Sequence, residues 1–171
     1  RNELVAHQFV TGSARSESEE VSVGGLDDVD AAVFAPFDYT ALGHIHRAQQ
    51  HGANIRYSGS PLKYSFSEAA YDKSVTVVTL GAKGDVAVDT VPLVPMHDMR
   101  EIKGSYMQIT DKSFYENFAA DDYVHITLTD EDDIIDAVGK LRSIYPNIMK
   151  LDYDNERTRA NAEITVDTEL R

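Results

Sequence analysis

The chain has 171 residues, of which 42% are hydrophobic and 26% charged, as in an ordinary folded protein and unlike a disordered or collagenous one. It contains no cysteine, which excludes a disulfide scaffold, a thiolate zinc site, an iron–sulfur cluster and a cysteine nucleophile. The net charge of -13 argues against a surface coated with nucleic acid, since phosphate binding relies on lysine and arginine. No membrane-spanning apolar run and no signal peptide is visible, so we expect a cytoplasmic protein.

The first 97 residues predict short strands separated by turns. In chain order we expect a strand at 4–8, an exposed acidic excursion at 11–30, a short helix at 31–37 and buried strands at 38–42 and 55–58. The turn Gly59-Ser60-Pro61 ends the last of these strands. Residues 74–80 are the clearest strand, because β-branched side chains alternate there, and we expect a hairpin partner at 86–91. The chain begins at Arg1 and enters an apolar segment at once, so we expect a fragment of a longer protein.

Residues 98–171 predict a second domain. We expect a strand at 99–110, a helix at 112–119 capped by Asp111, a strand at 123–129, an amphipathic helix at 131–145, a strand at 148–153 and a polar, peripheral segment at 155–171. This β-α-β-α-β order predicts a small two-layer α+β domain. The acidic run 130–133 lacks the glycine and the distal glutamate of a calcium loop, and we expect it to cap a helix.

The strongest chemical signal is Gly43-His44-Ile45-His46, which directly follows a predicted buried strand. Histidines at i and i+2 of an extended chain project to the same side, and imidazole is the commonest protein ligand for zinc, manganese or iron. His7 follows another predicted strand, at the end where sites of open α/β sheets gather. Three histidines with an open position match the ligand count of carbonic anhydrase, although nothing else here supports that chemistry. Exposed loop histidines and hydrogen-bonded structural histidines give the same pattern.

Four segments, in order, resemble the SbcD family, the nuclease subunits of bacterial SbcCD DNA-repair complexes: Val5-Ala6-His7-Gln8, Asp38–Arg47, Tyr57–Pro61 and Ser65-Phe66-Ser67-Glu68. The family belongs to the calcineurin-like metallophosphoesterases, and the resemblance runs through residues 4–80. It implies an α/β to α+β fold. Residues 1–97 would form the back half of a metallophosphoesterase β-sandwich core, and residues 98–171, which fit more loosely, the capping domain.

The resemblance also implies two divalent metal ions, usually manganese, held by five motifs of which this chain carries two. His7 and His44 would bind one ion and His46 the other. The Asp-x-His, the bridging Asp and the Asn-His pair of the first three motifs are absent from the sequence. We therefore expect this fragment to be catalytically inactive, with at most one ion held weakly. Two such ions would stabilise the attacking and leaving oxygens of a phosphodiester.

By the same resemblance the parent protein would be an exonuclease and endonuclease acting on DNA ends and hairpins, as a homodimer with SbcC, a coiled-coil ATPase. Candidate DNA contacts are Arg47, Arg56 and Lys63 for phosphates, Tyr64 for stacking on unpaired bases, and Ser60 at the groove rim. Ordinary surface charge and a structural turn explain these residues equally well, and Tyr57 suits the core better than a base.

Two other functions remain open. The chain could be a non-catalytic module in which residues 98–171 bind DNA or a partner protein, without metal dependence. It could also come from a calcineurin-like phosphoesterase that acts on small nucleotides.

Overall fold

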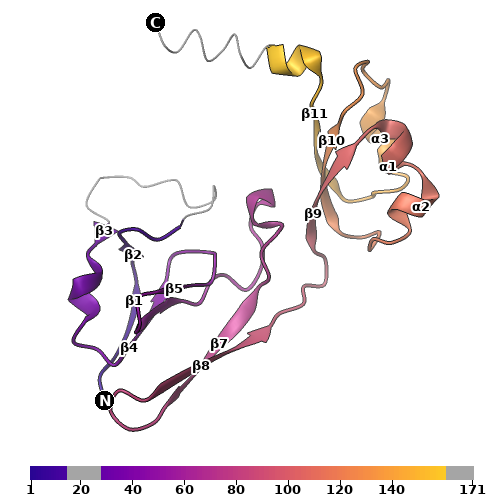
Figure 1. The fold of residues 1–171 in the computed structure, drawn as a ribbon. Coiled ribbons are helices and arrows are strands. Elements are labelled where there is room, and N and C mark those ends of the chain that lie inside the picture. The colour runs from indigo at the N-terminus through magenta and orange to yellow at the C-terminus, as the bar shows by residue number, and fades with distance from the viewer. Residues whose placement is uncertain (15–27, 161–171) are drawn as a thin grey trace, which may run out of the picture. The chain divides into compact units, whose positions relative to one another are not determined.

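The computed structural model describes residues 1–14 and 28–160 (Figure 1). The chain divides into two units, Arg1–Met96 and His97–Arg171, and each combines strands with short helices. Most of the predicted acidic excursion at 11–30 and the last part of the segment 155–171 fall outside the described residues. In the described parts of the chain, no helix has the length and apolar character needed to cross a membrane.

The first unit is built on a four-stranded sheet with the order β1-β4-β6-β5. Its strands are β1 (Glu3–His7), β4 (Tyr39–Gly43), β6 (Ile55–Tyr57) and β5 (Gln49–His51). The first three run parallel and β5 pairs antiparallel with β6. The strands predicted at 4–8, 38–42 and 55–58 are thereby confirmed, whereas β5 was not expected.

Shorter elements surround this sheet. They are β2 (Phe9–Val10), which pairs in parallel with β3 (Asp28–Val29), and the 3-10 helices η2 (Ala31–Phe34) and η3 (Phe66–Glu68). Helix η2 takes the place of the helix predicted at 31–37, and it begins where the Asp30 carboxylate accepts the Ala32 N–H at 2.8 Å. The predicted hairpin is confirmed as β7 (Ser74–Leu80) and β8 (Val86–Pro92), paired from Ser74 opposite Pro92 to Leu80 opposite Val86 (Figure 1).

Tyr57 fixes the core of the first unit to the segment that follows β1. Its side chain is fully buried, in a cluster with Phe9, Val10, Phe34, Leu42, Ile45 and Ile55. Its hydroxyl accepts the Val10 N–H at 2.8 Å and donates to the Gln8 carbonyl at 3.0 Å. Tyr57 is therefore a core residue, as its sequence context favours.

The second unit is a parallel three-stranded sheet with the order β11-β10-β9. Its elements in chain order are β9 (Met99–Gly104), α1 (Tyr106–Ile109), α2 (Lys112–Tyr115), β10 (Tyr123–Leu128), α3 (Ala137–Leu141) and β11 (Ile148–Tyr153). The predicted alternation of strands and helices is confirmed, and α1, α2 and α3 lie to one side of the sheet (Figure 1). Asp111 caps α2 as predicted, by accepting the Ser113 N–H at 2.8 Å.

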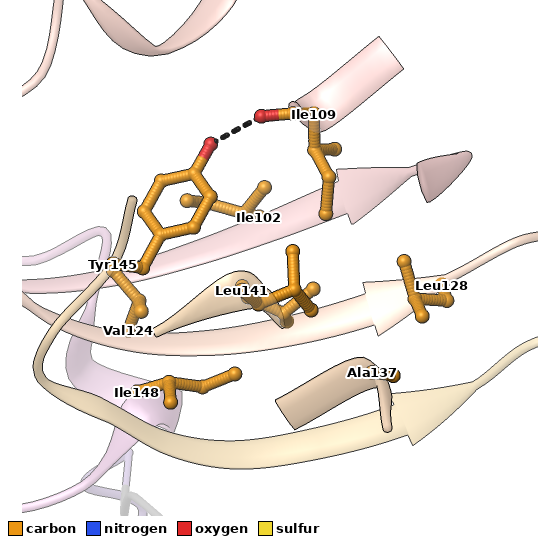
Figure 2. Close-up of a cluster of buried hydrophobic side chains, with 9 residues drawn as sticks. Ile102, Ile109, Val124, Leu128, Ala137, Leu141, Tyr145 and Ile148 are labelled. Atoms are coloured by element: carbon orange, nitrogen blue, oxygen red, sulfur yellow. Dashed lines mark hydrogen bonds between the residues drawn. The ribbon is translucent and has the colours of Figure 1, made fainter. Parts of the chain in front are cut away.

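The core of this unit lies between the sheet and the helices. Figure 2 shows side chains from alternate strand positions meeting Ile109, Ala137 and Leu141. The Tyr145 hydroxyl donates to the Ile109 carbonyl at 2.7 Å, and burial raises the pKa of Tyr145 to about 12. Alternation along a parallel strand thus leaves one face apolar and packed, and the other polar.

Three predicted elements of the second unit are wrong in extent, and the first is the helix predicted at 112–119, which ends at Tyr115. The strand predicted at 99–110 ends at Gly104, because Ser105 caps α1 through the Gln108 N–H at 3.3 Å. The helix predicted at 131–145 is confined to Ala137–Leu141, and Asp136 before it takes the left-handed conformation with a φ of 53°.

Carboxylates of the acidic run 130–133 cap helices elsewhere in the chain and not α3, the helix that follows the run. Asp130 accepts the Tyr106 N–H at 2.7 Å at the start of α1, and Glu131 accepts the Glu156 N–H at 3.1 Å, where helical residues 156–160 begin. Asp133 pairs with the guanidinium of Arg157 at 2.6 Å, and this hydrogen bond lowers the pKa of Asp133. A carboxylate at a helix N-terminus satisfies a backbone N–H and complements the helix dipole.

Candidate metal centre

Two of the three predicted metal ligands meet at one edge of the first unit's sheet. β1 and β4 are adjacent and parallel, with His7 directly opposite Gly43. The chain turns after Gly43, which places the His44 ring edge-on to the His7 ring, with 5.3 Å between their centroids and 82° between their planes. Parallel strands end at the same edge of a sheet, so side chains far apart in sequence gather there.

The backbone at this edge is unusual in two respects. A Cβ on Gly43 would lie 2.8 Å from the His7 Nδ1, so the missing side chain makes room for the His7 ring. His44 has a φ of 99°, a left-handed conformation that residues with a side chain rarely adopt. Strain of this kind costs about 1–3 kcal/mol and persists only where the surrounding structure enforces it.

His46 is held by a buried ionic network. Its Nδ1 lies 3.0 Å from Oε1 of Glu68, and the other Glu68 oxygen lies 2.6 Å from the Lys73 ammonium. Glu68 is 0% exposed and Lys73 only 7%. Lys73 also donates to the Ser60 hydroxyl at 2.8 Å and to the His46 carbonyl at 3.0 Å. Sequence reasoning noted Glu68 only as part of the Ser-Phe-Ser-Glu segment and missed this network.

The turn after β6 clamps the His46 backbone. The Ser60 N–H donates to the His46 carbonyl at 3.0 Å, and the Ser60 hydroxyl donates to the Leu62 carbonyl at 2.7 Å. Gly59 has a φ of 77°, and a Cβ there would lie 2.8 Å from the Ala48 nitrogen. Ser60, a predicted DNA contact, is 8% exposed and lies inside this turn.

Two predicted DNA contacts lie beside His46. Tyr64 is 61% exposed, and its ring centroid is 5.3 Å from that of His46. The Arg47 guanidinium lies over the Tyr71 ring at 4.9 Å, next to a pocket of about 180 Å³ lined by residues 46–48 and 70–73. An exposed aromatic ring and a stacked guanidinium are groups that bind bases and phosphates.

The other two basic candidates make contacts within the unit. Arg56 donates from Nε to the Thr76 hydroxyl at 3.3 Å on β7, and Lys63 donates to the Ala69 carbonyl at 2.7 Å. Their role in DNA binding stays a prediction.

The donor set suits a first-row transition metal, because imidazole nitrogen is a good ligand for manganese, iron or zinc. Within residues 1–14 and 28–160, however, no three His, Asp or Glu side chains converge as a metal site. The structure supplies a His7–His44 pair and a carboxylate-held His46, and their binding of metal stays a prediction.

Fold and side chains together define a mixed α/β protein with histidines at the carboxyl ends of two adjacent parallel strands. Residues 95–171 match the family model described as the type 5 capsule protein repressor C-terminal domain, the SbcD C-terminal domain. Over 168 residues, 95% of the chain, it is 33% identical to the SbcD subunit of nuclease SbcCD from Staphylococcus epidermidis. The chain therefore belongs to the SbcD family and corresponds to a C-terminal part of it. It spans 45% of the length of that relative.

Proposed function

We propose that this chain carries part of the metal site of an SbcD-type nuclease that hydrolyses phosphodiester bonds at DNA ends and hairpins. The observation that carries the proposal is the meeting of His7 and His44 at two parallel strand ends, with His46 held two residues further on. A relative that is 33% identical is named as part of a nuclease, which supports the same activity for the parent protein in DNA repair and recombination.

The three histidines divide between two metal ions in this proposal. His7 and His44 would bind one divalent ion and His46 a second, with manganese as the expected metal. Such ions supply Lewis acidity, which polarises the phosphodiester and lowers the pKa of water. The ligands still needed would come from parent-protein residues outside this chain, so the 171-residue chain alone is expected to cleave no DNA.

The substrate proposal is supported by local charge. The whole chain carries a net charge of -13, but residues 38–73 contain four basic side chains, three acidic ones and three histidines. Arg47 lines the same pocket as His46 and stacks on Tyr71, and the Tyr64 ring lies near the His46 ring, so a guanidinium for a phosphate and an aromatic face for an unpaired base are both available close to His46. The relative is named as one component of SbcCD, so an SbcC-like coiled-coil ATPase that opens DNA ends is the proposed partner, and the parent protein would act as a homodimer.

The test uses the full-length protein with Mn²⁺ and end-labelled duplex and hairpin DNA. We expect metal-dependent cleavage that His44→Ala abolishes and that His51→Ala, a histidine hydrogen-bonded to Ser13 instead, retains. DNA binding that is equally tight with and without Mn²⁺, and no cleavage, would favour the non-catalytic module. Hydrolysis of small phosphodiesters without cleavage of duplex ends would favour the small-nucleotide phosphoesterase.

A further inference from the structure

A carboxylate and an ammonium lie completely inside the first unit, directly behind His46. Glu68 is 0% exposed and Lys73 7%, although charged side chains are almost never buried unless they are paired. The Lys73 ammonium has three donors, and it has three acceptors: Glu68 Oε2, the Ser60 hydroxyl and the His46 carbonyl. The pair therefore forms a saturated network in which His46 takes part twice.

Stability alone gives a poor reason for such a pair. Taking two charges out of water costs several kcal/mol per ion, and apolar residues of similar volume often fold as well or better in their place. What an apolar pair could not do is hold the ring and the main chain of His46 at once. Glu68 Oε1 contacts the His46 Nδ1 at 3.0 Å, while Lys73 reaches the carbonyl of the same residue at 3.0 Å.

We propose that Glu68, anchored by Lys73, is a positioning residue that fixes the orientation and the tautomer of His46 for metal binding. This inference rests on the proposed function, in which His46 is a ligand. An ionised carboxylate can only accept, so the neutral imidazole beside it carries its proton on Nδ1 and its lone pair on Nε2. A carboxylate behind a ligating histidine orients the ring and makes it a better donor, and loss of such a partner lowers metal affinity roughly 10–100-fold.

The chain itself shows why Glu68 can do this and why a surface carboxylate could not. Glu68 ends the 3-10 helix η3 (Phe66–Glu68), where its N–H donates to the Ser65 carbonyl at 3.1 Å, so its backbone is fixed as well as its side chain. Both carboxylate oxygens are engaged, one by the ring and one by Lys73. Rotation of the carboxylate would break both contacts, so the position of Oε1 is set from two directions.

The first test reads the tautomer directly in the unmutated full-length protein without metal, by nitrogen NMR with ¹⁵N-labelled histidine. The resonances of His46 are assigned by their loss in His46→Gln. We expect a protonated Nδ1 and an unprotonated Nε2. A proton on Nε2 would overturn the proposal without the need for any variant of Glu68.

The second test measures the affinity of the full-length protein for Mn²⁺ alone, by electron paramagnetic resonance titration. Glu68→Leu combined with Lys73→Met removes both buried charges together, so no lone charge is left in the core. We expect affinity to fall roughly 10–100-fold and the preference of His46 for a protonated Nδ1 to be lost. In Glu68→Gln the one remaining oxygen faces the Lys73 ammonium, so the amide NH₂ faces the His46 Nδ1, and the preference for a protonated Nδ1 should be lost in this variant too.

His51→Ala is the matched control, because it removes a histidine of the same unit that contacts Ser13 and leaves the His46–Glu68 contact in place. It should keep both the tautomer and the Mn²⁺ affinity, whatever it does to stability. Unchanged affinity in the double variant refutes the positioning role while the proposed function stands. If the unmutated protein binds no Mn²⁺, the proposed function fails and the positioning role fails with it.

Discussion

Tyr57→Phe tests whether a single buried hydroxyl holds the segment between His7 and β2 in place. The substitution keeps the ring, so it creates almost no cavity, and removes only the oxygen that bonds to Val10 and Gln8. Val10 is fully buried, and its N–H would lose this acceptor in a site from which water is excluded. A buried donor left unpaired costs about 1–3 kcal/mol. We expect the first unit to lose about 2 kcal/mol.

Urea unfolding of the 171-residue chain, followed by amide NMR signals, separates the two units. With a urea dependence of about 2 kcal/mol per molar, the midpoint of the first unit should fall by roughly 1 M. Signals from the second unit provide the internal reference and should keep their midpoint. Tyr64→Phe is the control, because that side chain is 61% exposed and its change should stay within about 0.5 kcal/mol. A Tyr57→Phe midpoint equal to that of the unmutated chain would refute the reasoning.

Three further predictions concern other parts of the structure. Gly43→Ala places a Cβ 2.8 Å from the His7 Nδ1 and should displace the His7 ring. We expect the Mn²⁺ affinity of the full-length protein to fall roughly tenfold while the circular dichroism spectrum is retained. Equal Mn²⁺ affinity in the variant and the unmutated protein would contradict this packing of His7 against Gly43. The difference in tyrosine absorbance between the unmutated chain and Tyr145→Phe should titrate near pH 12. Because the pKa of Tyr145 is raised from 10.0 to about 12, its contribution to stability is complete below pH 10 and lost as the pH rises to about 12, and a midpoint at pH 10 would count against its burial. Asn155→Ala removes the side chain that accepts the Thr158 N–H at 3.0 Å and donates to the Asp130 carbonyl at 3.1 Å. Urea unfolding should show that the second unit loses about 1–2 kcal/mol of stability. An unchanged free energy of unfolding would mean that this helix cap does not stabilise the unit.

Local sequence patterns predicted the elements that are stabilised mainly by contacts between residues close together in the sequence. The hairpin of β7 and β8 follows from alternating β-branched residues on either side of a glycine-containing turn, and both strands appear where they were predicted. The approach of His7 to His44 was also predictable, because each follows an apolar strand and parallel strands share an edge. The extents of α1 and α3 could not be predicted from the hydrophobic periodicity of the sequence alone. They depend on a left-handed residue at Asp136 and on carboxylates that cap a helix many residues away, such as Asp130 at Tyr106.

The network behind His46 lies beyond sequence reasoning for a related reason. His46 and Glu68 are 22 residues apart, and the contact between them depends on how the turn at Gly59 and helix η3 pack together. A lone glutamate or lysine in a loop normally indicates a solvated surface, so the two residue types by themselves do not indicate that this pair is buried. The weak signal available was the low number of acids between 38 and 73, which makes Glu68 stand out among three.

The φ of 99° at His44 sets the backbone preference of this position against the imidazole that the proposed metal site needs. Glycine would adopt this backbone without strain, so His44→Gly should relax the loop and give a chain at least as stable, yet one without the imidazole. A screen that selected only for thermal resistance would therefore tend to discard the histidine. A histidine in this conformation is therefore not what backbone stability alone would favour at this position, whereas the proposed metal site requires it.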